Sequence, residues 1–352
     1  LTLGYNTIDS KERTEIIQAL KQVGRMNRPM ELPKTWIQFK DKLFDTITGQ
    51  ERDATAEYFA VNPIPYSLGT DRFILTPTMD RIFEQWVGEK YVKTLYEIIA
   101  YCLIPDYPMH RLFCFIGGGL NGKSCYLRLI EKFIGSHNLC STELDTLLSS
   151  RFEITRLYKK LVCTMGETNF NELSKTSILK KLTGQDLIGF EYKNKIPFES
   201  RNYAKILIST NNLPETTDKT LGFYRRWLII DFPNQFNEEE DILSKIPEEE
   251  YNALTNKCIF IIKDLLDKRK FHEEGDIETR QKIYEDKSNP FDKFFKEAIE
   301  EDSSADIPKW EFEKKLNIWC KQNRFREMST VTIAKKMKDK QIHEVILRKE
   351  WY

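Results

Sequence analysis

The sequence predicts an α/β fold built around a parallel β-sheet between residue 106 and about residue 235. The first reason is the stretch from Phe113 to Leu129, in which a short apolar run, a glycine-rich turn and a helical pattern follow one another. The second reason is that further apolar runs alternate with helical patterns, which is typical of parallel strands joined by helices. The third is the composition, 40% hydrophobic and 31% charged, which indicates an ordinary globular protein.

A mostly helical accessory region is expected before the sheet, over residues 1–105. Asp9 or Ser10 can cap its first helix, which we expect to end near Val23. The apolar residues of this helix recur at helical spacing, which predicts a packing face rather than a functional one. These residues are Ile16, Ile17, Leu20 and Val23.

The rest of this region predicts two strands and a long helical segment. Residues 36–39 and 43–46 read as two short strands, because aromatic and aliphatic residues flank a polar turn. A helical pattern then runs from Thr78 to Leu103, and Gly88 divides it into two helices.

The glycine-rich turn has the spacing of a phosphate-binding loop, G-x-x-x-x-G-K-S. Glycines let successive backbone N–H groups converge on phosphate oxygens, and the following helix adds the positive end of its dipole. We expect Lys123 to contact the β and γ phosphates of ATP, and the Ser124 hydroxyl to bind Mg²⁺. Such a turn can also occur without a ligand, but the flanking strand and helix favour nucleotide binding. The predicted nucleotide-binding residues are Gly117, Gly118, Gly119, Leu120, Asn121, Gly122, Lys123, Ser124 and Cys125.

Polar residues follow two later apolar runs of the predicted sheet. Glu167 comes after the run 159–164, at the strand end where an acid can bind Mg²⁺ or polarise the attacking water. Glu167 and Ser124 are the two predicted metal ligands. Asn211 follows the run 205–209, where an amide can hydrogen-bond the γ-phosphate or the water. The alternative is that Asn211 only forms a turn.

The stretch 175–205 carries seven basic and three acidic residues, in a chain whose formal net charge is zero. A run of charge is usually a solvated face. Here part of it lies at the tip of a predicted hairpin, residues 188–198, which favours contact with nucleic-acid phosphates. The residues expected to make this contact are Lys180, Lys181, Lys193 and Lys195.

Two arginines, Arg225 and Arg226, precede the last predicted strand, residues 228–232. Paired arginines can stabilise the charge of phosphoryl transfer, either in their own subunit or across a subunit boundary. The acidic stretch 238–250 is predicted to be a solvated connector before a helix over 251–266.

The C-terminal part is predicted to be a charged linker followed by a small module. Residues 267–289 are poor in core-forming side chains, which suits a linker. Three short helices and a strand follow, an order that resembles a winged-helix module. We expect Lys335, Lys336, Lys338 and Lys340 to crowd its last helix, where a DNA-reading helix usually lies. The predicted helices span about 290–300, 309–322 and 330–340, and the strand spans 343–351.

The order of these motifs resembles the superfamily 3 helicases of the poxvirus and phage or plasmid primase-helicase type. The motifs are GGGLNGKS, the strand ending in Glu167, KKLTGQD, ILISTNNLP and GFYRRW. The resemblance implies an AAA+-like P-loop core that assembles as a ring, commonly a hexamer, encircles a DNA strand and moves 3′ to 5′. It also implies the roles of Walker B acid for Glu167, sensor 1 for Asn211, and arginine finger for Arg225 or Arg226. Gly166 departs from the general pattern, because it stands in place of a second Walker B acid.

The function implied by this resemblance is that of an ATP hydrolase, a replicative DNA helicase of a viral or plasmid genome. Its cofactors would be ATP and Mg²⁺, and its partners a DNA single strand or fork and further copies of the chain. Three alternatives remain open: a loader or origin-binding module without processive unwinding, a structural ring protein, and an RNA helicase. A primase-like cluster of acids or histidines is absent upstream, so we expect any primase to be a separate domain or subunit.

Composition narrows location and organisation. No apolar run approaches the roughly 18 residues that span a bilayer, and Leu1 begins no signal-peptide pattern. We therefore expect an intracellular, cytoplasmic protein without a membrane partner, and a fragment of a longer polypeptide because no Met starts it. Seven scattered cysteines predict reduced thiols and no zinc site. The predicted domains are residues 1–105, 106–270 and 271–352.

Overall fold

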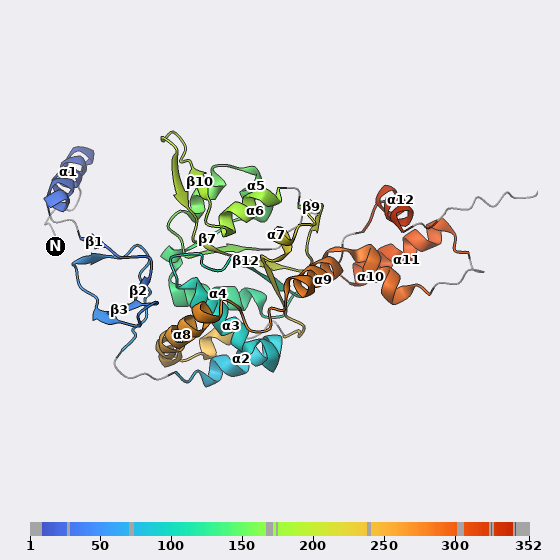
Figure 1. Ribbon diagram of the computed structural model, residues 1–352, viewed down its shortest axis with the longest axis horizontal. Coiled ribbons are helices and arrows are strands. Elements are labelled where there is room, and N and C mark those ends of the chain that lie inside the picture. Colours follow the sequence, from blue (N-terminus) through green and yellow to red (C-terminus); the bar gives the residue numbers. More distant parts are fainter. Residues whose placement is uncertain are drawn as a thin grey trace, which may run out of the picture.

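A computed structural model of the chain describes residues 9–26, 29–69, 74–166, 172–173, 175–237, 241–300, 306–323, 325, 327–340 and 342. At its centre lies a five-stranded parallel sheet with the strand order β14-β6-β12-β8-β7 (Figure 1). The strands are β6 (Leu112–Ile116), β7 (Leu139–Ser141), β8 (Val162–Met165), β12 (Lys205–Thr210) and β14 (Trp227–Asp231). The predicted α/β fold with a parallel sheet is therefore confirmed.

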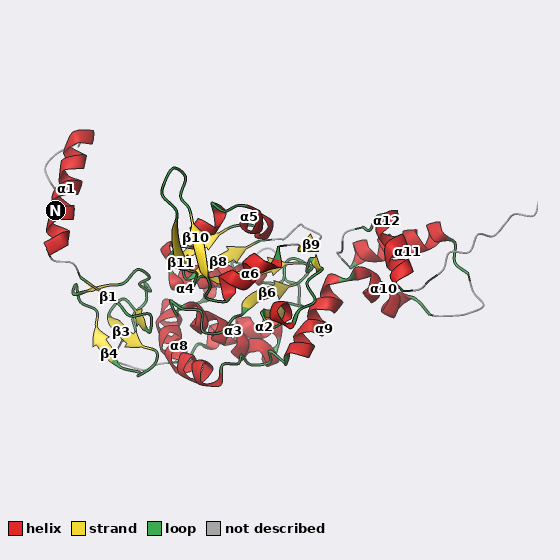
Figure 2. Cartoon of the chain, turned by 45° about the horizontal axis from the view of Figure 1, so that its top comes forward, coloured by secondary structure: helices red, strands yellow, loops and turns green. Residues whose placement is uncertain are grey.

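Helices cover both faces of this sheet, which explains why its central strands are continuous apolar runs. Every residue of β6 and of β12 is buried. Phe113 and Phe115 join the hydrophobic cluster of α2, α3, α4 and α8, whereas Leu112, Cys114 and Ile116 join the cluster on the opposite face. Figure 2 shows α2, α3 and α8 on one side of the sheet and α5 and α6 on the other. These helices are α2 (Pro77–Val87), α3 (Glu89–Cys102), α4 (Lys123–Ile134), α5 (Leu144–Ser149), α6 (Thr176–Thr183) and α8 (Glu248–Lys268).

The register of the sheet sets which strand ends meet. Thr210 at the end of β12 pairs with Ile116 at the end of β6, and Asp231 at the end of β14 pairs with Ile116 on the other side. The strand β8 ends at Met165, which pairs with Ile208. The carboxyl ends of these strands therefore lie along one edge of the sheet.

Among the described residues, the part of the chain before α2 contains one helix and two small sheets. The predicted strands near residues 37 and 44 are confirmed, and β4 joins them in an antiparallel sheet. The helix α1 is also confirmed, but its apolar side chains are exposed, with Leu20 at 65%. Within the described residues, the prediction that this apolar face packs against the rest of the chain is therefore wrong. The elements are α1 (Ser10–Met26), β1 (Met30–Glu31), β2 (Trp36–Gln38), β3 (Lys42–Asp45), β4 (Glu51–Asp53) and β5 (Tyr58–Phe59).

Gly88 separates α2 from α3, and the Glu250 carboxylate binds the N-terminus of α2. The predicted division of the long helical segment is confirmed, because α2 ends and α3 begins on either side of Gly88. Glu250, placed by the sequence in a solvated connector, is 6% exposed. Its carboxylate accepts hydrogen bonds from the backbone N–H groups of Thr78 and Met79 at the start of α2. An acid at a helix N-terminus satisfies donors that the helix itself leaves unpaired.

The region 267–289, predicted to be a linker, contains the packed helix α9 (Ile277–Ser288). Asp276 caps this helix by accepting a hydrogen bond from the Thr279 N–H. Few residues of α9 are apolar, but Arg280, Tyr284 and Ser288 form one buried face at a spacing of four. Tyr284 belongs to the hydrophobic cluster of the sheet. The linker prediction failed because most of the face that packs is polar.

The C-terminal helices form a small core of their own at one end of the molecule, opposite α1 (Figure 1). The three predicted helices are confirmed as α10 (Pro290–Ala298), α11 (Lys309–Gln322) and α12 (Thr330–Asp339). The predicted strand 343–351 lies outside the described residues, and the domain boundaries stay predictions. Within the described ranges, every helix is too short or too polar to cross a bilayer.

The remaining short elements border the sheet. A two-stranded antiparallel hairpin, β10 with β11, and a parallel pair, β9 with β13, lie outside the main sheet. The bounds are β9 (Glu172–Leu173), β10 (Leu187–Phe190), β11 (Phe198–Arg201), β13 (Glu215–Thr216), α7 (Leu221–Tyr224) and the 3₁₀ helices Ser136–Asn138, Glu153–Leu157 and Ile242–Lys245.

A buried lysine anchors the central strand β12. The Lys205 ammonium donates hydrogen bonds to the carbonyls of Ile104 and Asp106, the latter at 2.8 Å. It also lies 5.0 Å from the ring centre of Tyr101 and 5.8 Å from that of Tyr107. Burial lowers the pKa of Lys205 from its ordinary 10.5 to about 7. The strand is thereby tied to the segment that joins α3 to β6.

This burial predicts a pH-dependent stability. Between pH 7 and pH 10.5 the unfolded chain keeps the Lys205 proton and the folded chain has lost it, so stability rises with pH. From pH 7 to pH 9 the free energy of unfolding of the native protein should rise by about 2 kcal/mol relative to Lys205→Met. Urea unfolding of both proteins at the two pH values measures this difference. A difference that stays constant or falls would contradict the argument.

Candidate nucleotide-binding site

The glycine-rich loop joins the central strand β6 to α4 at the carboxyl edge of the sheet. The strand ends at Ile116, and α4 begins at Lys123. Gly122, the residue before the helix, has a φ of 90°, a backbone conformation that favours glycine. The Gly122 carbonyl accepts the first helical hydrogen bond, from the Tyr126 N–H at 2.8 Å. The N-terminus of α4 therefore opens directly onto the loop, as binding of an anion requires.

Close packing leaves no space for a side chain at two of the loop glycines. A Cβ atom on Gly117 would lie 1.8 Å from the amide nitrogen of Asn121 and 2.6 Å from the Phe232 carbonyl oxygen. A Cβ atom on Gly122 would lie 2.3 Å from Nε1 of Trp86. Trp86 belongs to α2 and packs against Gly122. The sequence could not reveal this contact, because the loop motif does not indicate which distant residue packs against it.

The loop's own polar groups hold Lys123 in place. Lys123 is 5% exposed. Its ammonium donates to the Gly117 carbonyl at 2.5 Å and to Oδ1 of Asn121 at 3.0 Å. The Asn121 amide in turn donates to the Phe232 carbonyl at 3.2 Å. The ammonium thus lies inside the loop, where phosphate oxygens can replace these neutral acceptors, while Ser124 is exposed at the start of the helix.

The neighbouring strand brings Asn211 to this loop. The Gly117 N–H donates to the Thr210 carbonyl at 3.3 Å, so the residue after β12 follows directly beside the first loop glycine. Glu167, the predicted Walker B acid, lies outside the described residues. Its strand β8 ends two residues earlier, on the other side of β12. Among the described residues no group of three His, Cys, Asp or Glu could hold a metal ion.

The loop fits the nucleotide that the sequence predicts. Glycines at 117 and 122 that leave no space for a side chain, a buried lysine ammonium and a helix N-terminus are features that a polyphosphate site needs. In such a complex, Lys123 would contact phosphate oxygens and the Ser124 hydroxyl would face Mg²⁺.

The two predicted finger arginines differ sharply in their surroundings. Arg226 is 7% exposed and donates to Oγ1 of Thr183 at 2.8 Å, to the Lys180 carbonyl at 3.2 Å and to the Gly222 carbonyl. Burial, followed by repulsion from Arg225, lowers the pKa of Arg226. Arg225 itself is exposed. Of the two side chains, Arg225 is therefore the one that is accessible at the surface.

The predicted hairpin projects from the sheet, at the top of Figure 1. Its strands β10 and β11 pair from Leu187 opposite Arg201 to Phe190 opposite Phe198. The rings of Phe190 and Phe198 stack with centroids 5.6 Å apart, at the end of the strands that leads into the tip. Its tip is exposed and carries Lys193 and Lys195.

The other two predicted nucleic-acid contacts lie on α6. Lys181 is exposed, but the Lys180 ammonium lies 2.5 Å from Oδ2 of Asp218 and donates to Oγ1 of Thr220 at 3.0 Å. Burial would raise the pKa of Asp218, but hydrogen bonds from Lys180, Thr176 and Thr220 lower it well below its ordinary value. Lys180 therefore joins α6 to the segment before α7.

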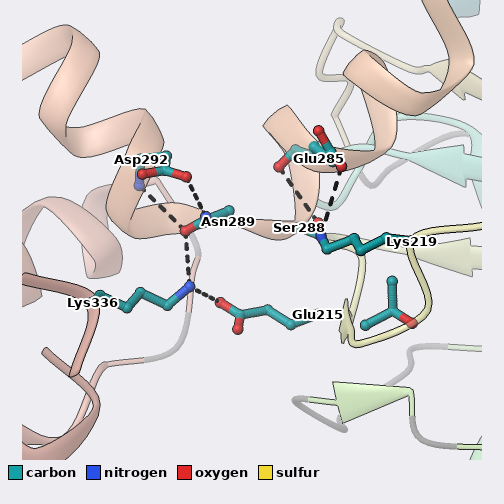
Figure 3. Close-up of a pocket in the computed structure, with 8 residues that line it drawn as sticks. Glu215, Lys219, Glu285, Ser288, Asn289, Asp292 and Lys336 are labelled. Carbon is teal, nitrogen blue, oxygen red and sulfur yellow. Dashed lines mark hydrogen bonds and ion pairs between the residues drawn. The ribbon is translucent and has the colours of Figure 1, made fainter. Parts of the chain in front are cut away.

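Lys336 of α12 and Lys340, directly after this helix, are also engaged within the chain. The Lys336 ammonium lies 2.8 Å from Oε1 of Glu215 and donates to Oδ1 of Asn289 at 3.1 Å, as Figure 3 shows. Lys340 pairs with Asp292 at 2.7 Å. Lys336 is partly buried by these contacts, whereas Lys335, Lys338 and Lys340 are exposed. The DNA-reading role of this helix stays a prediction.

Three comparisons show which known proteins this chain is similar to. A family model described as a family of unknown function (DUF5906) matches residues 115–226, which run from β6 to Arg226. An uncharacterized mitochondrial protein, ymf21 of Marchantia polymorpha, is 27% identical over 148 residues, covering 38% of this chain and 82% of that protein. Apo structures of the NrS-1 C-terminal region are 15% identical to this chain. Their TM-scores are 0.45 to 0.47, and the matches cover 96 to 98% of this chain and 87 to 90% of theirs.

The packing of the loop predicts the cost of filling it. Gly122→Ala places a methyl group against Trp86 and forces a positive φ on alanine, so it should lower the free energy of unfolding by about 1 to 3 kcal/mol or more. Gly189→Ala on the hairpin is the matched control, since nothing lies within 4 Å of its added Cβ atom. Chemical denaturation of the two variants measures the contrast. Equal stability would show that the loop yields to the methyl group.

Proposed function

We propose that the chain binds ATP with Mg²⁺ in the loop 117–124 and hydrolyses it. The observation that carries this proposal is the loop between β6 and α4, in which Gly117 and Gly122 leave no space for a side chain, Lys123 is buried and the N-terminus of α4 follows directly. Bound Mg²⁺ would neutralise charge on the β and γ phosphates. Lys123 would contact the same phosphates, Asn211 would orient the attacking water or the γ-phosphate, and Glu167 would join Ser124 at the metal or act as the base.

The site is completed by a second copy of the chain in this proposal. Arg226 is bound within its own subunit, whereas Arg225 is exposed beside it. We assign the arginine finger to Arg225, which would stabilise the transition-state charge at a neighbour's ATP. Such an arrangement requires an oligomer, and the resemblance to superfamily 3 helicases makes a hexameric ring the expected one.

The substrate of the motor is nucleic acid in this proposal. Lys193 and Lys195 occupy an exposed tip on a hairpin that is braced by stacked aromatic rings, which suits contact with a phosphate backbone. We propose single-stranded DNA or a fork as the ligand and 3′ to 5′ unwinding as the activity, in replication of a viral or plasmid genome. The choice of DNA and the 3′ to 5′ direction come from the resemblance, and the exposed basic tip supports only contact with a phosphate backbone.

Strand displacement on a forked DNA duplex tests the whole proposal. The native protein with Mg²⁺ and ATP should separate the strands, and Lys123→Ala should not, with the particle mass recorded in the same buffer. ATP hydrolysis without displacement would favour the loader alternative. An active Lys123→Ala protein would overturn the site.

The hairpin makes a separate prediction. A double variant Lys193→Ala, Lys195→Ala should keep basal ATP hydrolysis and lose unwinding, because it removes phosphate contacts and leaves the loop intact. The salt dependence of single-strand binding, the slope of log K against log salt, should fall by about 0.7 for each contact removed. The matched control is Lys263→Ala, Lys270→Ala, two exposed lysines on and after α8. Equal loss in both double variants would contradict the hairpin's role.

Substitution of Arg225 should affect ATP turnover, whereas substitution of Arg226 should affect stability. Arg225→Ala should melt like the native protein and lose about 10³-fold in ATP turnover of the oligomer, the usual contribution of an arginine finger. Arg226→Ala should lose about 3 kcal/mol of stability, because it leaves buried acceptors without their charged donor. Thermal unfolding and steady-state hydrolysis of both variants measure this. An unstable Arg225→Ala protein, or one with native turnover, would contradict the assignment.

A further inference from the structure

A buried arginine on α9 contacts the backbone of the proposed finger residue. Arg280 is 5% exposed, and its Nη1 atom donates a hydrogen bond to the Arg225 carbonyl at 3.0 Å. Arg225 follows the short helix α7, at a helix end whose carbonyls lack partners within the helix. The guanidinium of Arg280 therefore supplies a charged donor where the turn would otherwise need one from elsewhere.

An ion-pair cluster orients this guanidinium. The Arg111 side chain donates to both carboxylate oxygens of Glu274, at 3.0 and 3.1 Å. Arg280 lies 3.7 Å from the same carboxylate, and the Arg280 and Glu274 side chains are only 6% and 4% exposed. Because Arg111 directly precedes β6, the cluster connects the strand that carries the phosphate loop with the turn that carries Arg225. A fixed charged donor in a buried site has little freedom to move.

The residues on either side of Arg225 are also held. The Tyr224 hydroxyl donates to Oε1 of Glu285 at 2.9 Å, and Glu285 also lies 3.6 Å from the Lys219 ammonium (Figure 3). The Arg226 backbone carbonyl accepts from the Leu112 N–H at 2.7 Å. Three consecutive residues are thus anchored to α9 or to the sheet, while the Arg225 side chain alone is exposed.

We propose that Arg280 is a positioning residue for Arg225, holding the backbone turn from which the finger reaches the neighbouring subunit. This inference rests on the proposed function, since it presumes that Arg225 acts at another subunit's ATP. Arg280 does not contact the nucleotide in this account. It acts through the Arg225 carbonyl, and a shift of the turn by about 1 Å can cost on the order of 10²-fold in rate.

Subunit mixing separates positioning of the finger from general damage. In a ring with fingers supplied across boundaries, each active site combines one subunit's loop with its neighbour's Arg225. Lys123→Ala subunits keep a good finger but lack a working loop, and Arg225→Ala subunits have the reverse defect. Mixing these two should restore ATP hydrolysis that neither shows alone.

Arg280→Gln should behave as a finger-side variant. Alone it should hydrolyse ATP about 10- to 100-fold more slowly than the native protein with an unchanged KM. Mixed with Lys123→Ala subunits it should recover to the same extent as Arg225→Ala does, and mixed with Arg225→Ala subunits it should not recover. Lys282→Gln, which removes an exposed charge from the same helix, should keep native turnover.

The opposite pattern would overturn the inference. Recovery with Arg225→Ala subunits would place the defect at the loop side, and failure to recover with either partner would show general damage. If Arg280→Gln does not fold, as judged by thermal unfolding, Arg280→Lys replaces it. That variant keeps a cationic donor and should show a smaller loss, again rescued only by Lys123→Ala subunits.

Different results are expected if the proposed function itself is wrong. If Arg225→Ala turns over ATP like the native protein, or the Lys123→Ala and Arg225→Ala mixture stays inactive, no finger acts across subunits. That result removes the positioning role together with its premise. A working mixture of these two proteins with native-like Arg280→Gln removes the positioning role alone.

Discussion

The insertion of β12 between β6 and β8 is the constraint on which the candidate site depends. Because all three strands are parallel, their carboxyl ends meet at one edge, and the pairing of Thr210 with Ile116 sets Asn211 beside the first glycine of the loop. Helices on both faces bury this arrangement, and Lys205 ties the inserted strand to the segment before β6. The loop geometry is thus a property of the sheet rather than of the motif alone.

Much of the fold was predictable because its signals are local. Continuous apolar runs predicted β6, β12 and β14, and hairpin chemistry predicted β10 and β11. The structure differed where tertiary contacts decide the outcome. The helix α9 buries Arg280 and Tyr284 on a face that is mostly polar, so hydrophobic periodicity could not reveal it. The apolar face of α1 shows the reverse, since its periodicity predicted packing and its side chains are exposed.

The sequence predicted which residues belong to the candidate site, but it did not predict the contacts that give each residue its role. The spacing of the loop predicted its position after a strand and before a helix, but the support that Trp86 gives to Gly122 comes from a distant helix. Likewise, the sequence offered Arg225 and Arg226 as equivalent. Hydrogen bonds to Thr183, Gly222 and Lys180 distinguish them, and such contacts depend on how α6 packs against α7. Roles that depend on burial become visible only in the folded chain.

The central claim of this account is that the loop at the end of β6 binds a nucleotide, and equilibrium binding tests it most directly. Isothermal titration of ADP and of a non-hydrolysable ATP analogue, with Mg²⁺, needs neither assembly nor DNA to give an answer. The account predicts one nucleotide bound for each native chain and loss of that binding in Lys123→Ala, a variant that should melt like the native protein. Equal binding by both proteins, or none by the folded native protein, would contradict it.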